Sequence, residues 1–449
     1  MKIKLLSAAL ALGLSTVIAP VNATNLTDIY MLALENDPQL LRSAAERDAA
    51  KAGVDVSRAD WWPQIDFSVS YSDSKQDSVV TNDDGTWNIR SSSGTRFGRQ
   101  VSLSQTVFNL GTWRSTDIVE KQAYQAEVSY LLSRQQLMLR VTQTYFGVLS
   151  ALDSLEFAQA EKRAIERQLE QTRQRFSVGL TAITDVHEAQ AQFDNALARE
   201  IQAQNAVEIA LEGLREITGR QHDNIHVLNT ENFSPSSPEP QGVANWIETA
   251  HDRNLQLLIG RSSVEVANQR IELARAGHYP TVRLNASYSD DDQDSNGRDI
   301  SGLNSRQIGL TASIPLYSGG RTIASTQQAR DNFVVASQSL EESRRSVERA
   351  VRSSYFDVVA AISTINALEQ AVISAESALN ATQAGFEVGT RTIVDVLNST
   401  RNLFDARRNL SEARYNYINR TLALRQAAGT ISERDLLGIN ASLVAPSAD

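Results

Sequence analysis

The sequence contains an internal duplication. The motif Phe-x-Val-Gly, followed after five residues by Asp-Val, begins at Phe176 and again at Phe386, 210 positions later. A Tyr-Phe pair at Tyr145 recurs at Tyr355 with the same offset. A fixed offset that holds over distant motifs is the signature of a repeated structural unit. The chain is therefore expected to fold as two similar halves rather than as unrelated domains.

The motifs and a proline-rich segment between them define the expected organisation. It comprises a signal peptide over 1–23, a first repeat over 24–233, a linker over 234–241, a second repeat over 242–430, and a C-terminal segment over 431–449. Residues 1–23 have the parts of a secretory signal: Lys2 and Lys4, an apolar stretch, and small residues before Ala23. The apolar stretch is short and interrupted, which disfavours a membrane anchor. We therefore expect export and cleavage after Ala23.

Composition narrows the class of protein further. The chain has no cysteine, so an exported form has no disulfides and no cysteine for a lipid anchor. Its formal net charge of -10 argues against nucleic acid, which requires a clustered basic face. Aromatic residues make up only 6%, and such a composition favours long helices packed through small side chains.

Each half contains two segments in which apolar and polar residues alternate. These predicted strands cover 62–72 and 96–108 in the first half, and 280–289 and 305–317 in the second. Their length suits a tilted membrane-spanning strand, and polar loops are expected between partners. A soluble β-sandwich would also alternate, but aromatic residues cluster at the strand ends, as in the belts of membrane barrels. These residues are Trp61, Trp62, Phe108, Trp113, Tyr279 and Tyr317.

Four strands cannot close a membrane barrel, because single-chain barrels begin at eight strands. An open sheet edge is not tolerated in lipid, so several chains must share one barrel. Two copies would supply eight strands and three would supply twelve. The sequence alone does not choose between these numbers.

A very long helix is expected in each half. From Thr112 to Ser177 the sequence has no proline, and at ~1.5 Å per residue such a helix would be roughly 100 Å long. Val141, Tyr145 and Val148 begin a coiled-coil spacing that recurs from Val351. An ordinary helical bundle explains this seam but not the length, whereas a tube of helices explains both.

The chain resembles the TolC-type outer-membrane channel family, also called outer-membrane factors. The most specific stretches are Arg175–Val186 and Val388–Leu397, supported by Ala413–Tyr417 and Glu433–Leu437. The resemblance covers nearly all of the chain after residue 23. It implies a mixed membrane α/β fold: a trimer whose twelve-stranded β-barrel, with four strands per chain, continues into a long α-helical coiled-coil barrel. A belt around the helices would be built from the segment after Gly219 and the C-terminal stretch.

The same resemblance implies a function. The chain would be the exit duct of tripartite efflux pumps or of type I protein secretion, in the cell outer membrane with its helical part in the periplasm. The implied partners are two further copies of the chain, a periplasmic adaptor protein, an inner-membrane transporter and outer-membrane lipid, with no cofactor and no nucleic acid. No residue identifies the cargo.

Two helix tips carry the residues that the resemblance places at a periplasmic gate. Gly179 and Gly389 stand where a helix reverses, a position that favours a left-handed residue. Thr392-x-x-Asp395 fits a capping box, in which the helix dipole favours a carboxylate. This structural role for Asp395 is compatible with a gating role, because symmetry would repeat the carboxylate around the pore.

By the resemblance, Arg391 would tie the inner hairpin to Thr184 and Asp185 of the outer hairpin or of a neighbouring chain, with Gln168 close by. A solvated surface arginine is the alternative for Arg391. The chain departs from the family pattern at Asn398, in place of a second pore aspartate, and at Phe386, in place of a hydrogen-bonding tyrosine. We therefore expect a less negative aperture, weaker block by multivalent cations, and a latch weaker by one hydrogen bond, about 0.5–1.5 kcal/mol.

Two other classes of function fit the sequence less well. It has no zinc-protease, P-loop or nucleophile-elbow motif and no cysteine nucleophile, so an enzyme is not expected. Among the five histidines, only His222 and His226 are close in sequence, which is too little for a metal site. A structural or adhesive coiled-coil protein without transport is the alternative to the duct; it explains the helices but not the strands.

Overall fold

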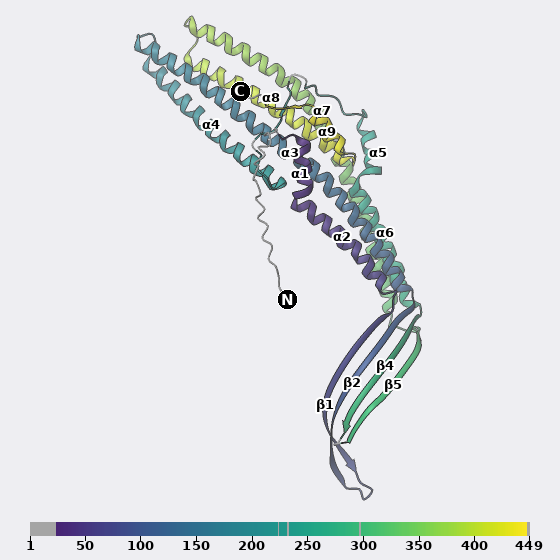
Figure 1. Cartoon of the computed structure of the whole chain (residues 1–449). Helices are drawn as coiled ribbons and strands as arrows, with labels where there is room; N and C mark the ends of the chain where they lie inside the picture. Colours follow the sequence, from purple (N-terminus) through teal and green to yellow (C-terminus); the bar gives the residue numbers. More distant parts are fainter. Residues whose placement is uncertain (1–23, 223, 231–232, 296–297, 447–449) are drawn as a thin grey trace, which may run out of the picture.

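The chain folds into an elongated molecule with a β-sheet at one end and two helical hairpin tips at the other (Figure 1). The computed structural model describes residues 24–446 apart from 223, 231–232 and 296–297. The expected signal peptide at 1–23 and the last three residues of the C-terminal segment lie outside the described residues.

Four long strands form one antiparallel sheet in the order β1-β2-β4-β5. They are β1 (Gln64–Thr81), β2 (Trp87–Asn109), β4 (Thr281–Ser295) and β5 (Arg298–Ser313). The two hairpins, one from each half, are joined through β2 and β4. Strands β1 and β5 are therefore the two edges of the sheet in the single chain.

The two faces of this sheet differ in polarity. Ile65, Leu103, Ala286 and Ile308 are aligned across the four strands and share one face. Their chain neighbours, aligned on the opposite face, are Asp66, Ser102, Ser287 and Gln307. The apolar face is open in the single chain, where Ile308 is 81% exposed. One face thus suits lipid and the other suits water, as in a membrane barrel.

The strands are longer than the predicted segments 62–72, 96–108, 280–289 and 305–317, and this corrects the prediction. Most of the expected loop after Tyr71 is strand, and the first hairpin turns only at Asn82, whose N–H donates to Thr86 O at 2.7 Å. The prediction ended each strand where apolar alternation stopped, yet backbone pairing needs no apolar face where water covers both sides. At the other end, β5 stops before Pro315, which has no N–H to continue the ladder.

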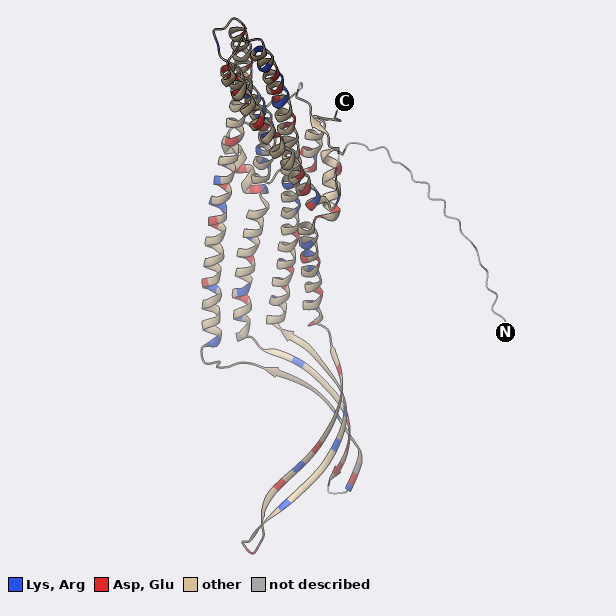
Figure 2. Ribbon diagram, turned by 90° about the vertical axis from the view of Figure 1, so that its left-hand side faces the viewer, with Lys and Arg blue, Asp and Glu red and all other residues tan. Residues whose placement is uncertain are grey.

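Four helices lie side by side, continue from one end of the sheet and follow the order of its strands (Figure 2). They are α2 (Pro38–Ala59), α3 (Leu110–Ser177), α6 (Leu255–Arg275) and α7 (Arg321–Glu387), and a short 3-10 turn over Ala276–His278 leads α6 into β4. Toward the tips, α4 (Ile183–Thr218) packs on α3, α8 (Ile393–Ala427) packs on α7, and α3 contacts α8. The predicted very long helices are confirmed, since α3 has 68 residues and α7 has 67.

The predicted coiled-coil seam forms the centre of the hydrophobic core. Val141, Tyr145 and Val148 of α3 are fully buried, as are Val351 and Val358 of α7. The Tyr145 hydroxyl donates a hydrogen bond to the carbonyl oxygen of residue 226 at 2.7 Å. The duplicated spacing therefore fixes the same packing face on both long helices.

Short elements surround the long helices near their midpoint. They are α1 (Leu26–Asn36), α5 (Val243–Arg253), α9 (Glu433–Asn440), β3 (Val227–Leu228) and β6 (Leu443–Val444). Strand β3 pairs with β6, which brings the segment after Gly219 against the C-terminal stretch, the two segments that the resemblance assigns to the belt.

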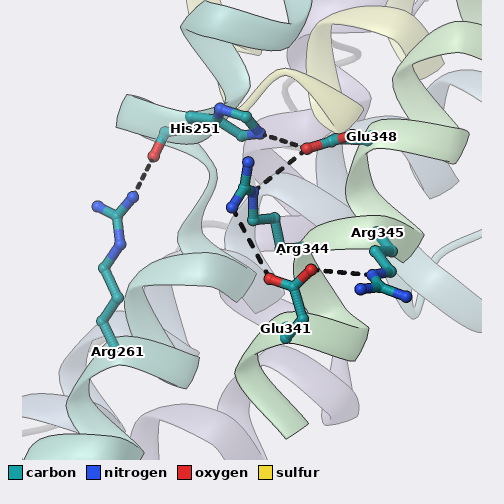
Figure 3. A network of polar contacts seen from close by, with 6 residues as sticks. All are labelled: His251, Arg261, Glu341, Arg344, Arg345 and Glu348. Carbon is teal, nitrogen blue, oxygen red and sulfur yellow. Dashed lines mark hydrogen bonds and ion pairs between the residues drawn. The ribbon is translucent and has the colours of Figure 1, made fainter. Parts of the chain in front are cut away.

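A polar network joins α5 of this belt to α6 and α7 of the wall (Figure 3). The His251 ring nitrogen Nε2 lies 2.9 Å from Glu348 Oε1, and Arg344 Nε lies 3.3 Å from the same oxygen. Arg344 also faces Glu341 at 3.7 Å, and Arg261 donates to the His251 carbonyl at 2.7 Å. The belt is thus held to the wall of helices by charged side chains as well as by apolar contacts.

Candidate functional site at the helix tips

The two tips have the same backbone geometry. Gly179 and Gly389 both adopt a φ of 79°, in the left-handed region that glycine tolerates. In each tip the glycine N–H donates to the phenylalanine three residues earlier, at 2.9 Å to Phe176 O and 3.1 Å to Phe386 O. The matched motif thus encodes one helix-ending turn twice.

Asp395 lies in the first turn of α8 and is held by Thr392. Its Oδ2 accepts hydrogen bonds from the Thr392 N–H and hydroxyl, both at 2.9 Å, and the Asp395 N–H donates to Thr392 Oγ1 at 3.3 Å. This is the capping box expected from the sequence. The hydrogen bond from the Thr392 backbone, and then that from its hydroxyl, lower the pKa of Asp395, and the Arg391 charge adds to this effect. The tip therefore presents a stable negative charge.

The outer tip is capped differently. Helix α4 begins after Ala182, which offers no side chain to the first-turn N–H groups. Asp185 instead accepts a short hydrogen bond from the Thr181 hydroxyl, and Thr184 is exposed. The outer and inner tips share a backbone turn but present different polar groups.

Arg391 does not reach the outer hairpin within one chain. Among the described residues its side chain makes neither an ion pair nor a hydrogen bond with Thr184 or Asp185, so the expected tie is not formed inside the protomer. Its stem lies on Gly385, where an added Cβ would come within 2.8 Å of Arg391 Cγ. The exposed guanidinium is therefore directed by the turn and is available to another chain.

Two further predicted residues lie near the tip without a fixed role in the single chain. Gln168 is on α3, and its buried Nε2 finds no hydrogen-bond partner among the described residues. Asn398 is half-buried on α8, one turn beyond Asp395. Neither residue therefore shows a gating contact among the described residues of one chain.

Phe386 has a partner that the sequence did not predict. The Arg175 guanidinium carbon lies 4.8 Å from the centre of the Phe386 ring. Phe386 also packs on an apolar cluster shared by three helices, formed by Ile165, Leu169, Ala189, Ala196, Ile393 and Leu397. A usable signal was present in the duplication, where Arg175 is matched by Gly385 and the two tips therefore differ.

The two histidines that are close in sequence, His222 and His226, lie in the segment after Gly219 and not at the tips. His222 is buried with its Nε2 2.9 Å from the Thr218 hydroxyl. Within the part of the chain that the structure describes, no group of three or more His, Cys, Asp or Glu residues could hold a metal ion. The polar groups that the tips present are therefore suited to charge and hydrogen-bond interactions.

Sequence comparison now places this architecture in a family. The profile described as Outer membrane efflux protein matches residues 29–220 and 246–430, so the chain belongs to the outer membrane efflux protein family. It is 47% identical to the outer membrane protein TolC of Vibrio cholerae serotype O1 over 98% of both chains. It is 30% identical to the alkaline protease secretion protein AprF of Pseudomonas aeruginosa, over 94% of this chain and 88% of AprF.

The fold also matches solved structures. A crystal structure of CusC, described for its conformational changes on folding and channel formation, superposes with a TM-score of 0.76. It is 18% identical and the match covers 90% of this chain and 92% of CusC. The protein is thus an exit channel of the outer membrane, of the class that serves efflux and type I secretion, and no comparison supports the structural or adhesive alternative.

Proposed function

We propose that three copies of this chain assemble into one continuous duct. The observation that carries the proposal is the four-stranded sheet, which has one apolar face and two unpaired edges, β1 and β5. Unpaired backbone groups in lipid cost several kcal/mol each. Pairing β5 of each copy with β1 of the next removes both edges, and three copies give the twelve strands that the family resemblance implies.

The helices offer matching edges. Helix α7 contains an 18-residue window with a mean hydropathy of 1.5 of which only 17% is buried. Ile323 and Val335 of α7 and Val56 of α2, at the two edges of the helical wall, are more than half exposed. Because α7 continues far beyond the length of a bilayer, we take its apolar surface as the contact for the neighbouring copy rather than as a membrane span.

The polar face of the sheet would line the lumen. It is built largely from small side chains such as Ser68, Ser102, Ser287 and Thr311. Such a wall leaves a wide aqueous passage. A duct of this kind releases cargo that a periplasmic adaptor protein and an inner-membrane transporter deliver, and these partners supply the energy.

The periplasmic end would be closed by the six tips of the trimer. Asp395 would form a ring of three carboxylates, which attracts cations and limits the aperture. Arg391, which has no ion-pair partner among the described residues of its own chain, would reach Thr184 and Asp185 of the neighbouring copy, with Gln168 close by. Asn398 and Phe386 remove one carboxylate and one hydroxyl from the family arrangement, so this gate holds less tightly.

The test is single-channel recording of the purified protein in planar bilayers. We expect a low resting conductance, and we expect Arg391→Ser to raise it because the link between copies is lost. Arg345→Ser is the matched control, since it removes an exposed arginine of α7 that lies far from the tip along the same hairpin. An unchanged conductance in Arg391→Ser would refute the latch, and absence of any channel would refute the duct.

The cargo class needs a separate experiment. A strain lacking the gene should be scored in parallel for sensitivity to drugs and bile salts and for loss of secreted proteins. Increased sensitivity together with loss of secreted proteins would assign the duct to both efflux and type I secretion. A strain with only one of these two defects would restrict the duct to the corresponding pathway.

A further inference from the structure

We infer that Arg175 is a positioning residue of the gate, which holds the inner hairpin against the outer hairpin through the ring of Phe386. The inference deepens the proposed gating function and rests on it. It replaces the missing tyrosine hydroxyl of Phe386 with a contact of a different kind, made inside each protomer.

The guanidinium of Arg175 is committed to this contact. It lies in the last turn of α3, and its Cζ is 4.8 Å from the centre of the Phe386 ring in the last turn of α7. Its Nε is buried and has no hydrogen-bond partner among the described residues, and no described carboxylate lies within 4.0 Å of its guanidinium. A guanidinium over an aromatic face is attracted by the ring quadrupole, and more strongly when water is excluded.

The contact joins the two hairpins at their ends. Each hairpin is internally well packed, α3 on α4 and α7 on α8, and the two hairpins meet mainly through α3 and α8, whereas the contact between Arg175 and Phe386 joins α3 to α7. The apolar cluster at the tip takes buried residues from α3, α4 and α8, and Phe386 is the described contribution of α7. Moving the inner hairpin away would expose the Phe386 ring and break its contact with Arg175 in the same step.

The duplication supports a dedicated role for this pair. The matched position of Arg175 is Gly385, which must be small because Arg391 Cγ lies 2.8 Å from the place of an added Cβ. The matched position of Phe386 is Phe176, which is 42% exposed. The same position of the repeat is therefore Arg175 in the first half, where it contacts the opposite hairpin. In the second half it is Gly385, where it leaves room for Arg391.

The test is a double-mutant cycle on resting conductance in planar bilayers. Arg175→Gln removes the charge, and Phe386→Leu keeps an apolar side chain but removes the ring face. Each single variant should raise the open fraction about fivefold, the effect expected for a partly shielded cation–π contact. The double variant should be no more open than the more open single variant, and Arg175→Lys should restore part of the closure.

Arg173→Gln is the matched control. It removes an arginine two residues away whose Nη2 donates to Gln190 within the outer hairpin, at 2.6 Å, so conductance should stay at the wild-type level. Equal behaviour of Arg175→Gln and Arg173→Gln would overturn the inference, as would fully additive single effects. Arg391→Ser in the same bilayers separates the two proposals. If it opens the channel while Arg175→Gln does not, the gate stands and the role of Arg175 falls. If neither opens it, the gate falls.

Discussion

At the scale of single residues, Asp395 and Asn398 would set the negative charge of the aperture in the proposed gate. Asp395 is fixed by the capping box, and its lowered pKa keeps it charged, whereas Asn398 one turn later carries no charge. We predict that Asn398→Asp strengthens block by multivalent cations by roughly tenfold, because a second carboxylate would face the same ion at short range.

The measurement is the blocking concentration of a trivalent cation in single-channel recordings. Asn195→Asp, an exposed position on the outer helix α4, is the control for added charge and should leave the block unchanged. Equal block of wild type and Asn398→Asp would mean that residue 398 does not face the pore.

The second residue-scale prediction uses two glycines at equivalent places in the repeat. Gly219 ends α4 with a φ of 69°, and Gly429 follows α8 with a φ of 73°. A Cβ on Gly219 would meet only the side chain of Asn36 at 3.8 Å, but one on Gly429 would lie 2.5 Å from the Arg253 carbonyl oxygen. Gly219→Ala should cost about 1 kcal/mol of backbone strain, and Gly429→Ala several kcal/mol, because backbone must also move.

Denaturant unfolding of the two variants checks this difference. The pair is its own control, since both change glycine to alanine at a positive φ. Similar losses of stability would show that the belt segment at Arg253 yields easily.

At the scale of elements, the contact between α3 and α8 contains a half-buried carboxylate, that of Asp153. Asp153 of α3 accepts hydrogen bonds from Tyr415 of α8 at 2.7 Å and from Ser411. Burial raises the pKa of Asp153 above its ordinary value, and the hydrogen bonds and the nearby Arg414 charge offset this only in part. The folded protein therefore holds a proton here at a pH where the unfolded chain has released it.

This direction gives a prediction of pH dependence. The stabilising contribution is fully present below the unfolded pKa of about 3.9 and is lost as the pH rises through the higher folded value. Asp153→Asn should remove this loss, so its stability relative to wild type should increase as the pH is raised from about 4. Unfolding at a series of pH values measures it, with Asp405→Asn, an exposed carboxylate of α8, as the control. A constant difference across pH would contradict the assignment.

The elements also show which features of the fold the sequence could predict. The glycine turns, the Thr392 capping box and the seam through Val141 follow from local rules, so they were predicted correctly. The full length of the strands was not, because the parts beyond the apolar band pair through backbone alone. The contact of Arg175 with Phe386 was not either, since it joins hairpins that are brought together only by packing of the long helices.

At the scale of the whole molecule, one chain would form a segment of the wall of the proposed duct. The four strands of the sheet and the helices that continue from them keep the same lateral order. The edge strand β1 therefore lies on the same side as α2, and the edge strand β5 on the same side as α7. Residues that look misplaced in the single chain, such as the exposed Ile308 and Val335, lie on the surfaces that lipid or a neighbouring copy would cover. The exposed apolar residues of one chain thus mark the surfaces that lipid or a neighbouring copy would cover in the proposed assembly.

The assignment of the apolar face of the sheet to lipid leads to a prediction. Leu310 lies on the apolar face of β5 between Ile308 and Ala312, and its chain neighbour Thr311 lies on the polar face. Leu310→Lys would place a charge in the hydrocarbon layer, at a cost of about 2–4 kcal/mol for each chain, whereas Thr311→Lys would place the same charge in the aqueous lumen.

The yield of oligomer inserted in the outer membrane, measured by electrophoresis without heating, distinguishes the two. We expect a large loss for Leu310→Lys and a near-normal yield for Thr311→Lys, which should alter ion selectivity instead. Because the two positions are adjacent and both exposed in a single chain, a general loss of strand stability would affect both alike. Equal loss from both variants would therefore contradict the assignment of the faces, and the reverse order would place the lumen on the side that we assign to lipid.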